Sequence, residues 1–294
     1  MTKEKCLIMG YGNAGKRHTL AMFKRGYEVH IMEVDNQSQE VRLDYDYWFP
    51  PSQLNQMIAE NTYKFAIIAT PPDTHPELLQ RLILANIPAL CEKPLCGFGQ
   101  LEQVKRLLNY KHYGRVMMAY NYRFDGRLVG AKRTWEAWKD MPVRRWRIFS
   151  SQCRTNLPSW GLLLDHVPHS LDILRWLTEP LEVVVKNCVH LHGTAGEETK
   201  TESYIVTGFV GSVPFEIVEH VQDTPTDKTA SVQGPFGTID MSEVNMGMFD
   251  DMYKVFFKHL DTSQDFPVGL REGIKTQELV QKCKEIERAK NDRP

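Results

Sequence analysis

The chain lacks paired cysteines, long apolar runs and a recognisable signal peptide, and each absence excludes a class of protein. Its six cysteines are scattered and form no C-x-x-C pair, which argues against a disulfide framework or structural zinc site and for a reducing compartment. No apolar run approaches the roughly 18 residues that cross a bilayer. The first residues lack the apolar core of a secretory signal. We therefore expect a cytoplasmic protein without a membrane partner.

The chain also lacks an excess of charge of either sign. Its formal net charge is −1, so no overall electric field attracts nucleic acid. The one basic stretch, residues 144–147, is short and is interpreted as the exposed face of a strand. The apolar fraction is 42% and the charged fraction 25%, which is ordinary for a globular protein. A length of 294 residues suits two domains or one large one.

Short apolar runs alternate with amphipathic stretches in the N-terminal part. Strands are predicted at residues 6–9, 28–32, 65–69, 89–91 and 116–120. Helices are predicted at residues 16–25, 52–61, 76–86 and 101–110. Continuous apolar strands separated by helices indicate a parallel sheet covered on both faces, which is the doubly wound Rossmann arrangement.

The pattern changes after about Tyr122. A strong helix at residues 168–177 is followed by a series of strands at residues 182–192, 203–210, 213–221, 230–233 and 237–241, and then by helices at 250–260 and 271–290. This order predicts an α+β domain on a mainly antiparallel open sheet. No flexible linker is present, so the domains are expected to be residues 1–122 and 123–294.

A glycine motif follows the first predicted strand. The motif matches G-x-G-x-x-G and consists of Gly10, Tyr11, Gly12, Asn13, Ala14 and Gly15. Such a loop between a strand and a helix binds a dinucleotide pyrophosphate at the helix N-terminus. The alternative is a glycine-rich turn in a fold that binds something else.

An acidic residue after the second predicted strand bears on the choice of cofactor. Glu33, or else Asp35, lies about 20 residues beyond the glycines, where a carboxylate accepts hydrogen bonds from the ribose 2′-hydroxyl. Such a carboxylate repels a 2′-phosphate. NAD is therefore the expected cofactor, while NADP remains possible.

Two further segments end predicted strands at the edge where ligands bind in such sheets. Thr70 and Pro71 begin one, and Glu92 and Lys93 begin the other. An ammonium at this position could polarise a substrate carbonyl or lower the pKa of a substrate hydroxyl. The alternatives are a simple proline turn and a solvated surface lysine.

A third group of polar residues lies at the start of the helix at 168–177. Asp165, His169 and Asp172 are spaced i, i+4, i+7, which places them on one face if the turn before Pro168 is also helical. Histidine has the reference pKa of a general base near neutral pH. Alternatively, Asp172 is a helix-face acid in a salt bridge, or His166 and His169 bind metal. Because hydride transfer needs no metal and no cysteine is near, we expect none.

These pieces together resemble the glucose–fructose oxidoreductase / inositol dehydrogenase (Gfo/Idh/MocA) family. The resemblance runs along most of the chain in residues 10–18, 70–75, 91–95, 119–124 and 164–172. It implies a Rossmann domain, an open-sheet domain, a bound nicotinamide cofactor, and a homodimer or homotetramer that forms through the C-terminal sheet. It also implies oxidation or reduction of a sugar, polyol or nucleotide-sugar hydroxyl.

The resemblance assigns roles to matching positions. It implies that Lys93, His169 and Asp165 are catalytic, and that His75, Pro71 and Glu92 join the cofactor site. It implies a substrate pocket lined by Asn121, Arg123, Trp160, Asp165 and His169. Alternatives are a reductase of a non-sugar substrate on the same scaffold and a catalytically silent NAD-binding regulatory protein. The segment before Asp165 is shorter than in many members.

Overall fold

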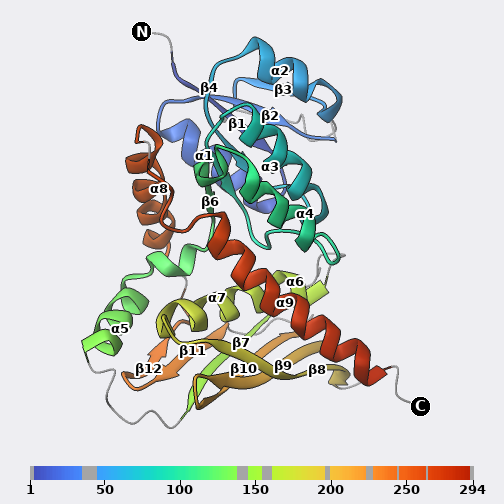
Figure 1. Ribbon diagram of the computed structural model, residues 1–294, viewed down its shortest axis with the longest axis vertical. Coiled ribbons are helices and arrows are strands. Elements are labelled where there is room, and N and C mark those ends of the chain that lie inside the picture. The colour runs from blue at the N-terminus through green and yellow to red at the C-terminus, as the bar shows by residue number, and fades with distance from the viewer. Residues whose placement is uncertain are drawn as a thin grey trace. The chain divides into compact units, whose positions relative to one another are not determined.

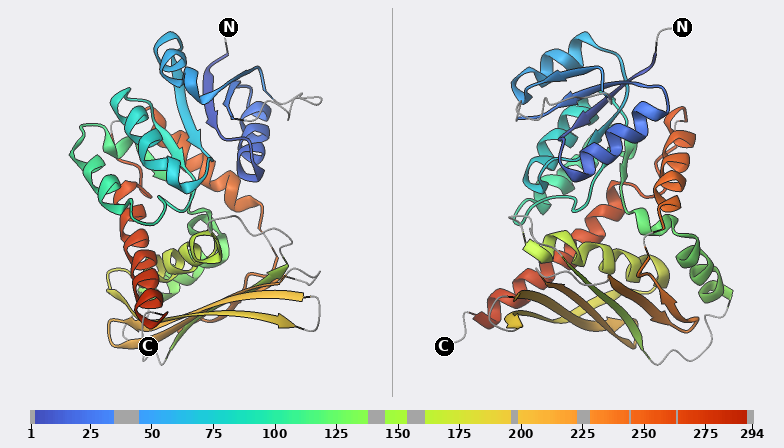
Figure 2. Two further views of the ribbon diagram at one scale, coloured as in Figure 1. Left: turned by 90° about the vertical axis from the view of Figure 1, so that its right-hand side faces the viewer. Right: turned by 180° about the vertical axis from the view of Figure 1, so that it is seen from behind.

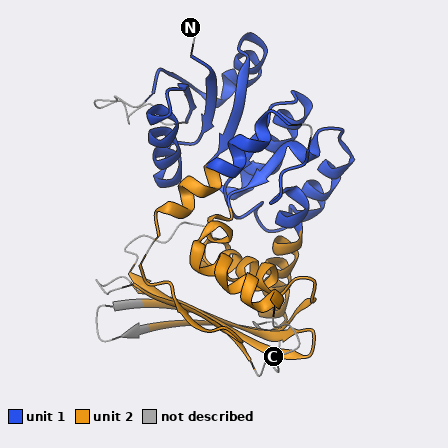
Figure 3. Cartoon of the chain, turned by 90° about the vertical axis from the view of Figure 1, so that its left-hand side faces the viewer, with its two compact units in different colours: residues 1–119, 254–274 blue, residues 120–253, 275–294 orange. Residues whose placement is uncertain are grey.

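The computed structural model describes residues 3–34, 45–137, 145–153, 161–195, 199–222, 228–243, 245–262 and 264–291. The chain divides into two compact units (Figure 3), of which unit 1 comprises Met1–Ala119 and Lys254–Ile274. Unit 2 comprises Tyr120–Tyr253 and Lys275–Pro294. The first change of unit lies close to the boundary expected at residues 122–123. The return of residues 254–274 to unit 1 was not predicted.

Unit 1 is built on a parallel six-stranded sheet of order β3-β2-β1-β4-β5-β6. The strands are β1 (Lys5–Met9), β2 (Glu28–Met32), β3 (Tyr47–Phe49), β4 (Tyr63–Ile68), β5 (Ala89–Cys91) and β6 (Val116–Met118). The helices between them are α1 (Asn13–Lys24), α2 (Leu54–Glu60), α3 (His75–Leu84) and α4 (Leu101–Arg106). This is the doubly wound Rossmann arrangement, and the prediction of it is confirmed.

The central strands form the core of unit 1 because both faces of the sheet are covered by helices (Figures 1 and 2). Every residue from Cys6 to Met9 and from Phe65 to Ile68 is fully buried. Burial of such continuous apolar runs explains why the strands could be predicted from the sequence. The strand order reverses between β1 and β4, which is where a doubly wound sheet binds its ligand.

The C-terminal segment of unit 1 packs against this core through aromatic rings. Phe256 and Phe257 lie in α8 (Gly247–Leu260). Their rings lie 5.4 Å and 5.7 Å from that of Phe65 on β4, and the Phe257 ring stacks on Tyr27 at 5.8 Å. Large aromatic side chains contribute most to such packing, which is why this distant segment belongs to unit 1.

Unit 2 contains a six-stranded sheet of order β12-β11-β7-β10-β9-β8. Its strands are β7 (Trp146–Cys153), β8 (Val183–Ala195), β9 (Thr199–Val210), β10 (Val213–Gln222), β11 (Thr229–Gly234) and β12 (Gly237–Asp240). All neighbouring pairs are antiparallel except β7 with β10. The predicted α+β domain on a mainly antiparallel sheet is therefore confirmed.

Helices cover one face of this sheet (Figures 1 and 2). They are α5 (Gly126–Ala137), α6 (Gly161–Asp165), α7 (Val167–Thr178) and the part of α9 (Leu270–Asn291) that belongs to unit 2. The opposite face bears no helix in the part of the chain that the structure describes. Strand β10 shows the resulting alternation, with Phe215, Ile217 and Val221 buried toward the helices. None of the described helices has the length and apolar character needed to cross a membrane.

The basic stretch at 144–147 overlaps β7, as expected for the exposed face of a strand. Trp146 is buried, whereas Arg147 is exposed and its guanidinium donates to the Glu216 carboxylate at 2.8 and 2.9 Å. Arg145 lies 3.6 Å from the same carboxylate. These charges are paired on the outward face of the sheet.

Candidate functional site

The glycine motif forms the tight turn between β1 and α1. Gly10 has φ +93°, and a Cβ there would lie 2.6 Å from the carbonyl oxygen of Ala69. A Cβ on Gly15 would lie 2.0 Å from the carbonyl oxygen of Gly10. A Cβ on Gly12, by contrast, would meet nothing within 4 Å. Two glycines are therefore required by the turn itself, whereas the third leaves open space at the helix N-terminus.

The Glu33 carboxylate lies against this turn. It accepts a 2.6 Å hydrogen bond from the backbone N–H of Tyr11 and another, also 2.6 Å, from Val34. The side chain is therefore held beside the glycine motif, as expected of the acid that selects the cofactor. The alternative acid, Asp35, lies outside the described residues. Asn13 and Ala14 form the first turn of α1, whose N-cap Gly12 has no side-chain cap.

Buried His75 joins the loops that follow β4 and β5. One ring nitrogen lies 2.9 Å from the carbonyl oxygen of Thr70, and the other lies 2.9 Å from that of Pro94. Burial lowers the pKa of this imidazole, although the two carbonyl contacts oppose the shift. Thr74 donates a hydrogen bond to the Thr70 hydroxyl at 2.6 Å, whereas Pro71 is exposed. His75 thus fixes the two loops relative to each other.

Glu92 and Lys93 follow β5, and a histidine that the sequence analysis did not select holds the first of them. His18, which is buried, lies in α1 with its Nε2 3.0 Å from the Glu92 carboxylate. Burial alone would raise the pKa of Glu92, but the hydrogen bond with His18 and the nearby positive charges lower it. The anionic Glu92 also accepts a 3.2 Å hydrogen bond from the Lys93 backbone N–H. Lys93 was selected because it follows β5, whereas His18 lies in the stretch 10–18 that carries the resemblance but was assigned no role there.

In unit 2, the junction of α6 and α7 brings the acidic and imidazole groups together. Asp165 ends α6 and is buried, His166 is the N-cap of α7, and His169 lies in the first turn. Nε2 of His166 lies 3.3 Å from the Asp165 carboxylate. The ring of Tyr122 makes an edge contact with His169 at 5.1 Å. Helix α7 begins one residue before the predicted start at 168, but Asp165 lies in the separate helix α6, where His166 is its partner.

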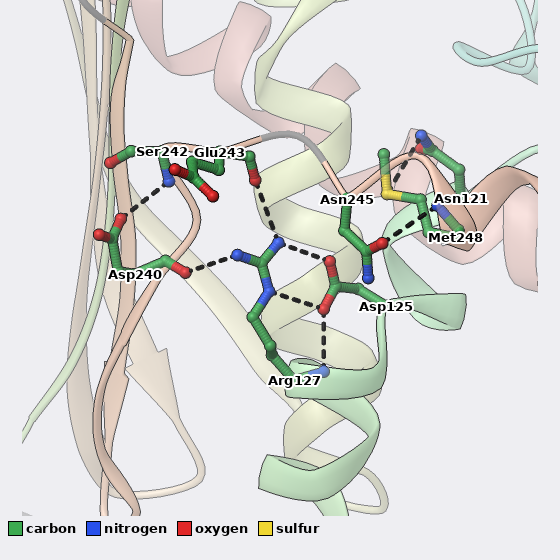
Figure 4. A network of polar contacts seen from close by, with 9 residues as sticks. Asn121, Asp125, Arg127, Asp240, Ser242, Glu243, Asn245 and Met248 are labelled. Atoms are coloured by element: carbon green, nitrogen blue, oxygen red, sulfur yellow. Dashed lines mark hydrogen bonds and ion pairs between the residues drawn. The ribbon is translucent and has the colours of Figure 1, made fainter.

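Asn121 and Arg123 lie in unit 2 directly after the last strand of the Rossmann sheet. The Asn121 Nδ2 lies 3.7 Å from the Met248 sulfur (Figure 4), while its buried Oδ1 has no hydrogen-bond partner among the described residues. A buried unpaired oxygen is unusual and fits a ligand contact. The Arg123 guanidinium donates to the Asp172 carboxylate at 2.6 and 2.8 Å. Trp160 lies outside the described residues.

The structure also bears on two alternatives from the sequence analysis, which are a salt bridge at Asp172 and a metal site near His166 and His169. Asp172 is buried and also accepts a 3.0 Å hydrogen bond from Thr276, so the salt-bridge interpretation of this acid is confirmed. No group of three or more His, Cys, Asp or Glu side chains is placed to hold a metal ion in the ranges described.

A network around Arg127 ties the segment before α8 to the start of α5 (Figure 4). Its guanidinium donates to the carboxylate of buried Asp125 at 2.7 and 3.0 Å. It also donates to the backbone carbonyls of Asp240 at 2.9 Å and Glu243 at 3.2 Å. This network stabilises the segment that follows Asn121 and the segment that precedes its neighbour Met248.

Glu219 is a second residue that the sequence analysis did not select. It lies on the buried face of β10, and the Ser170 hydroxyl donates a short hydrogen bond to its carboxylate. Burial raises the pKa of this carboxyl, an effect that His166, Ser170 and Ser150 only partly oppose. A charged residue in an otherwise apolar inward row, with Ile217 and Val221 on either side, is a signal that could have revealed it.

The raised pKa of Glu219 makes stability depend on pH. The folded chain binds the Glu219 proton more tightly than the unfolded chain, so this group lowers stability as pH rises above about 4.3. Glu219→Gln keeps an acceptor for Ser170 but removes the charge. We expect the variant to unfold at a higher temperature than the wild type at pH 8, with a difference that disappears near pH 4. Calorimetry at several pH values measures this, and a lower midpoint at pH 8 would contradict the assignment.

Comparison with known proteins decides the family. Residues 4–122 match the GFO_IDH_MocA model, described as an oxidoreductase family with an NAD-binding Rossmann fold. The N-terminal domain belongs to the GFO_IDH_MocA oxidoreductase family. Residues 4–122 accordingly form an NAD-binding domain. An uncharacterized oxidoreductase of Schizosaccharomyces pombe is 25% identical over 131 residues, covering 41% of this chain and 35% of that protein. The match thus spans about a third of the length of that curated relative.

Solved structures share the fold over nearly the whole chain. A myo-inositol dehydrogenase from Corynebacterium glutamicum is 18% identical with a TM-score of 0.75, covering 98% of this chain and 97% of that one. A scyllo-inositol dehydrogenase from Lactobacillus casei with bound NAD(H) and scyllo-inositol is 16% identical with a TM-score of 0.74 and 98% coverage of each chain. The WlbA dehydrogenase from Bordetella pertussis, in complex with NADH and UDP-GlcNAcA, is 18% identical with a TM-score of 0.72, covering 98% of this chain and 97% of that one. The C-terminal half of the chain therefore has the fold of these enzymes.

Proposed function

We propose that this GFO_IDH_MocA protein is an NAD-dependent dehydrogenase that acts on a hydroxyl of a polyol, sugar or nucleotide sugar. The observation that carries the proposal is the glycine turn with open space at Gly12 and the Glu33 carboxylate held against it. The open space suits a pyrophosphate, and the carboxylate suits a ribose with a free 2′-hydroxyl. NAD is therefore favoured over NADP. The inositol and UDP-sugar named for the solved neighbours support the substrate class.

Two alanine substitutions in the same turn separate cofactor binding from folding. Gly12→Ala adds a methyl group to open space, so we expect an unchanged unfolding temperature but NADH binding weakened by at least about tenfold, or ~1.4 kcal/mol. Gly15→Ala forces a Cβ against the Gly10 carbonyl, and we expect a loss of stability of about 1–3 kcal/mol or more. Fluorescence titration with NADH and urea unfolding measure the two effects. Unaltered NADH affinity in a folded Gly12→Ala variant would contradict this placement of the cofactor.

The proposed chemistry uses Lys93, His169 and Asp165. Bound NAD supplies the hydride acceptor. His169 takes the proton from the substrate hydroxyl as general base, a role that typically contributes about 10²–10⁴-fold. The Lys93 ammonium stabilises the negative charge that develops on the substrate oxygen. The Asp165 carboxylate, which is paired with His166, supports His169 by stabilising its charged form. Asn121 presents its unpaired Oδ1 to a ligand, while Arg123 and Trp160 remain substrate-binding proposals.

A substrate panel tests the function directly. We expect NAD reduction with at least one compound among myo-inositol, scyllo-inositol, hexoses and UDP-sugars, measured by NADH absorbance. The matched comparison is NADP with the same compounds, for which slower turnover is expected because Glu33 repels the 2′-phosphate. Normal NADH binding with no turnover of any compound would instead support a silent NAD-binding protein.

The open face of the sheet in unit 2 supports a homodimer or homotetramer. Phe149, Leu191 and Phe209 point away from the helices and are 40%, 48% and 41% exposed. Large exposed apolar side chains on one face are typical of association surfaces. Light scattering is expected to show two or four chains, and Phe209→Glu is expected to reduce that number. A monomeric wild-type protein at micromolar concentration would contradict this.

A further inference from the structure

Glu219 occupies a position in β10 where an apolar residue would be buried at a lower cost in folding free energy. The other inward residues of this strand, Phe215, Ile217 and Val221, are all apolar and buried. The carboxylate of Glu219 is 3% exposed. Burying a carboxylate costs several kcal/mol unless charges and hydrogen bonds offset it. A buried acid at such a position therefore points to a role beyond packing.

The contacts of Glu219 converge on the first turn of α7. Ser170, which directly follows His169, donates its hydroxyl hydrogen to Oε1 of Glu219. His166, three residues before His169, lies with its Nδ1 4.0 Å from Oε2. Ser150, which is paired with Glu219 across β7 and β10, forms a further side-chain hydrogen bond. One carboxylate therefore contacts both sides of the turn that carries His169.

His166 extends these contacts to Asp165. Its Nε2 lies 3.3 Å from the Asp165 carboxylate, while its Nδ1 faces Glu219. The side-chain amide of Gln152 lies 2.7 Å from Nδ1 and holds the ring from the sheet side. The ring therefore lies between the Asp165 and Glu219 carboxylates. Contacts between these three side chains connect α6, the start of α7 and β10.

The charge of Glu219 shifts the pKa of two more ionisable groups. Burial raises the pKa of Tyr122, the residue in edge contact with His169, and Glu219 raises it further. Burial lowers the pKa of Lys228, and Glu219 partly opposes this shift, while Arg127 adds to it. A change of charge at Glu219 therefore alters the electrostatic surroundings of His169 as well as the contacts that hold its helical turn.

We propose that Glu219 is a positioning residue of the candidate active site, which holds Asp165 and His169 in place through His166 and Ser170. The inference rests on the proposed function only in treating Asp165 and His169 as reactive groups. A displacement of about 1 Å in a reacting group can cost on the order of 10²-fold in rate. A carboxylate that fixes both sides of the α7 turn therefore favours a higher reaction rate, although its burial lowers the stability of the fold.

The first test does not need a substrate. Diethyl pyrocarbonate modifies histidine nitrogens that are unprotonated and accessible, and mass spectrometry of peptides reports each site separately. We expect Glu219→Gln to speed the modification of His166 several-fold at pH 6.5, because the ring loses the carboxylate beside its Nδ1 that helps to hold it in place. Ser170→Ala, which removes the second contact, is expected to speed modification of His169 and serves as the alternative if Glu219→Gln folds poorly.

The matched control is Glu216→Gln on the same strand. Glu216 faces outward and pairs with Arg145 and Arg147, so its loss should leave both histidine rates unchanged. Rates at His166 and His169 within twofold of the wild type in both Glu219→Gln and Ser170→Ala would overturn the proposal. Equal acceleration in Glu216→Gln would also overturn it, because the effect would then be a general loosening of the sheet.

The second test uses a compound that the panel shows to be turned over. Glu219→Gln is expected to lower kcat by about 10- to 100-fold with an unchanged KM for NAD. In a His166→Gln background the same substitution should add little, because partners acting through one contact are not additive. Full additivity would assign Glu219 a merely structural role. If no compound is turned over, the proposed function fails, whereas the modification rates still decide the role of Glu219.

Discussion

His169→Ala is expected to lower turnover by about 10²–10⁴-fold while NADH binding stays within twofold of the wild type. The loss corresponds to removal of a general base. The His169 imidazole lies in the first turn of α7 in unit 2, whereas the glycine turn proposed to bind the cofactor belongs to unit 1. Steady-state kinetics with a panel substrate and NADH titration measure the two quantities separately.

The control for this variant is a histidine of unit 2 on an exposed strand position. His192→Ala lies on β8, and we expect unchanged turnover and unchanged NADH binding. The pH profile adds a second check, because removal of a general base should also remove the limb of the profile that reports its titration. Full turnover in a folded His169→Ala variant would exclude the histidine from the chemistry.

Lys93→Met is the second substitution with a large expected effect. Methionine keeps much of the length and apolar character of the side chain but lacks the ammonium. We expect kcat to fall by at least about 10²-fold, because one preorganised charge at a developing oxyanion is worth roughly 3–4 kcal/mol. NADH affinity is expected to weaken much less. Stopped-flow and steady-state measurements distinguish the chemical step from binding.

A lysine outside the site provides the comparison for Lys93→Met. Lys105 lies in α4 and pairs with Glu102 at 3.0 Å on the surface. Such pairs contribute about 0–1 kcal/mol, so Lys105→Met should leave both turnover and NADH affinity unchanged. If Lys93→Met weakened NADH binding but left kcat intact, Lys93 would be a cofactor ligand rather than a catalytic group.

The sequence contained enough information to predict the Rossmann sheet because its strands are continuous apolar runs. The strands at Glu28–Met32 and Ala89–Cys91 match the predicted residues at both ends. The short edge strand at Tyr47–Phe49 was not predicted, since it has three residues and only Phe49 is fully buried. Local pattern identifies strands that are buried on both faces more readily than strands at the edge.

Elements of unit 2 were harder to predict where the pattern was weak. Helix α5 buries only Leu128, Ala131 and Trp135, so its apolar stripe is narrow and the sequence offered little helical signal. The α8 segment was predicted as a helix, but the membership of its residues 254–260 in unit 1 depends on ring packing between residues far apart in the chain. Contacts of this kind are not encoded in local periodicity.

The candidate site could be predicted where a motif fixes the backbone. Gly10, Gly15 and Glu33 have the geometry that the motif implies, because turn sterics and a carboxylate contact define them. His18 and Glu219 escaped prediction because their roles depend on partners distant in sequence, at separations of 74 and 49 residues. A single glutamate on a strand carries no motif of its own, and the motif stretch 10–18 does not reveal that Glu92 is the partner of His18.

The measurement that tests the account most directly is a double-mutant cycle on Lys93 and His169. NAD reduction is followed for the wild type, Lys93→Met, His169→Ala and the double variant with one panel substrate. We expect the double variant to be little slower than the slower single variant, because groups acting on one reacting oxygen are not additive. A double variant whose loss equals the product of the two single losses would show that Lys93 and His169 act independently and would contradict the account.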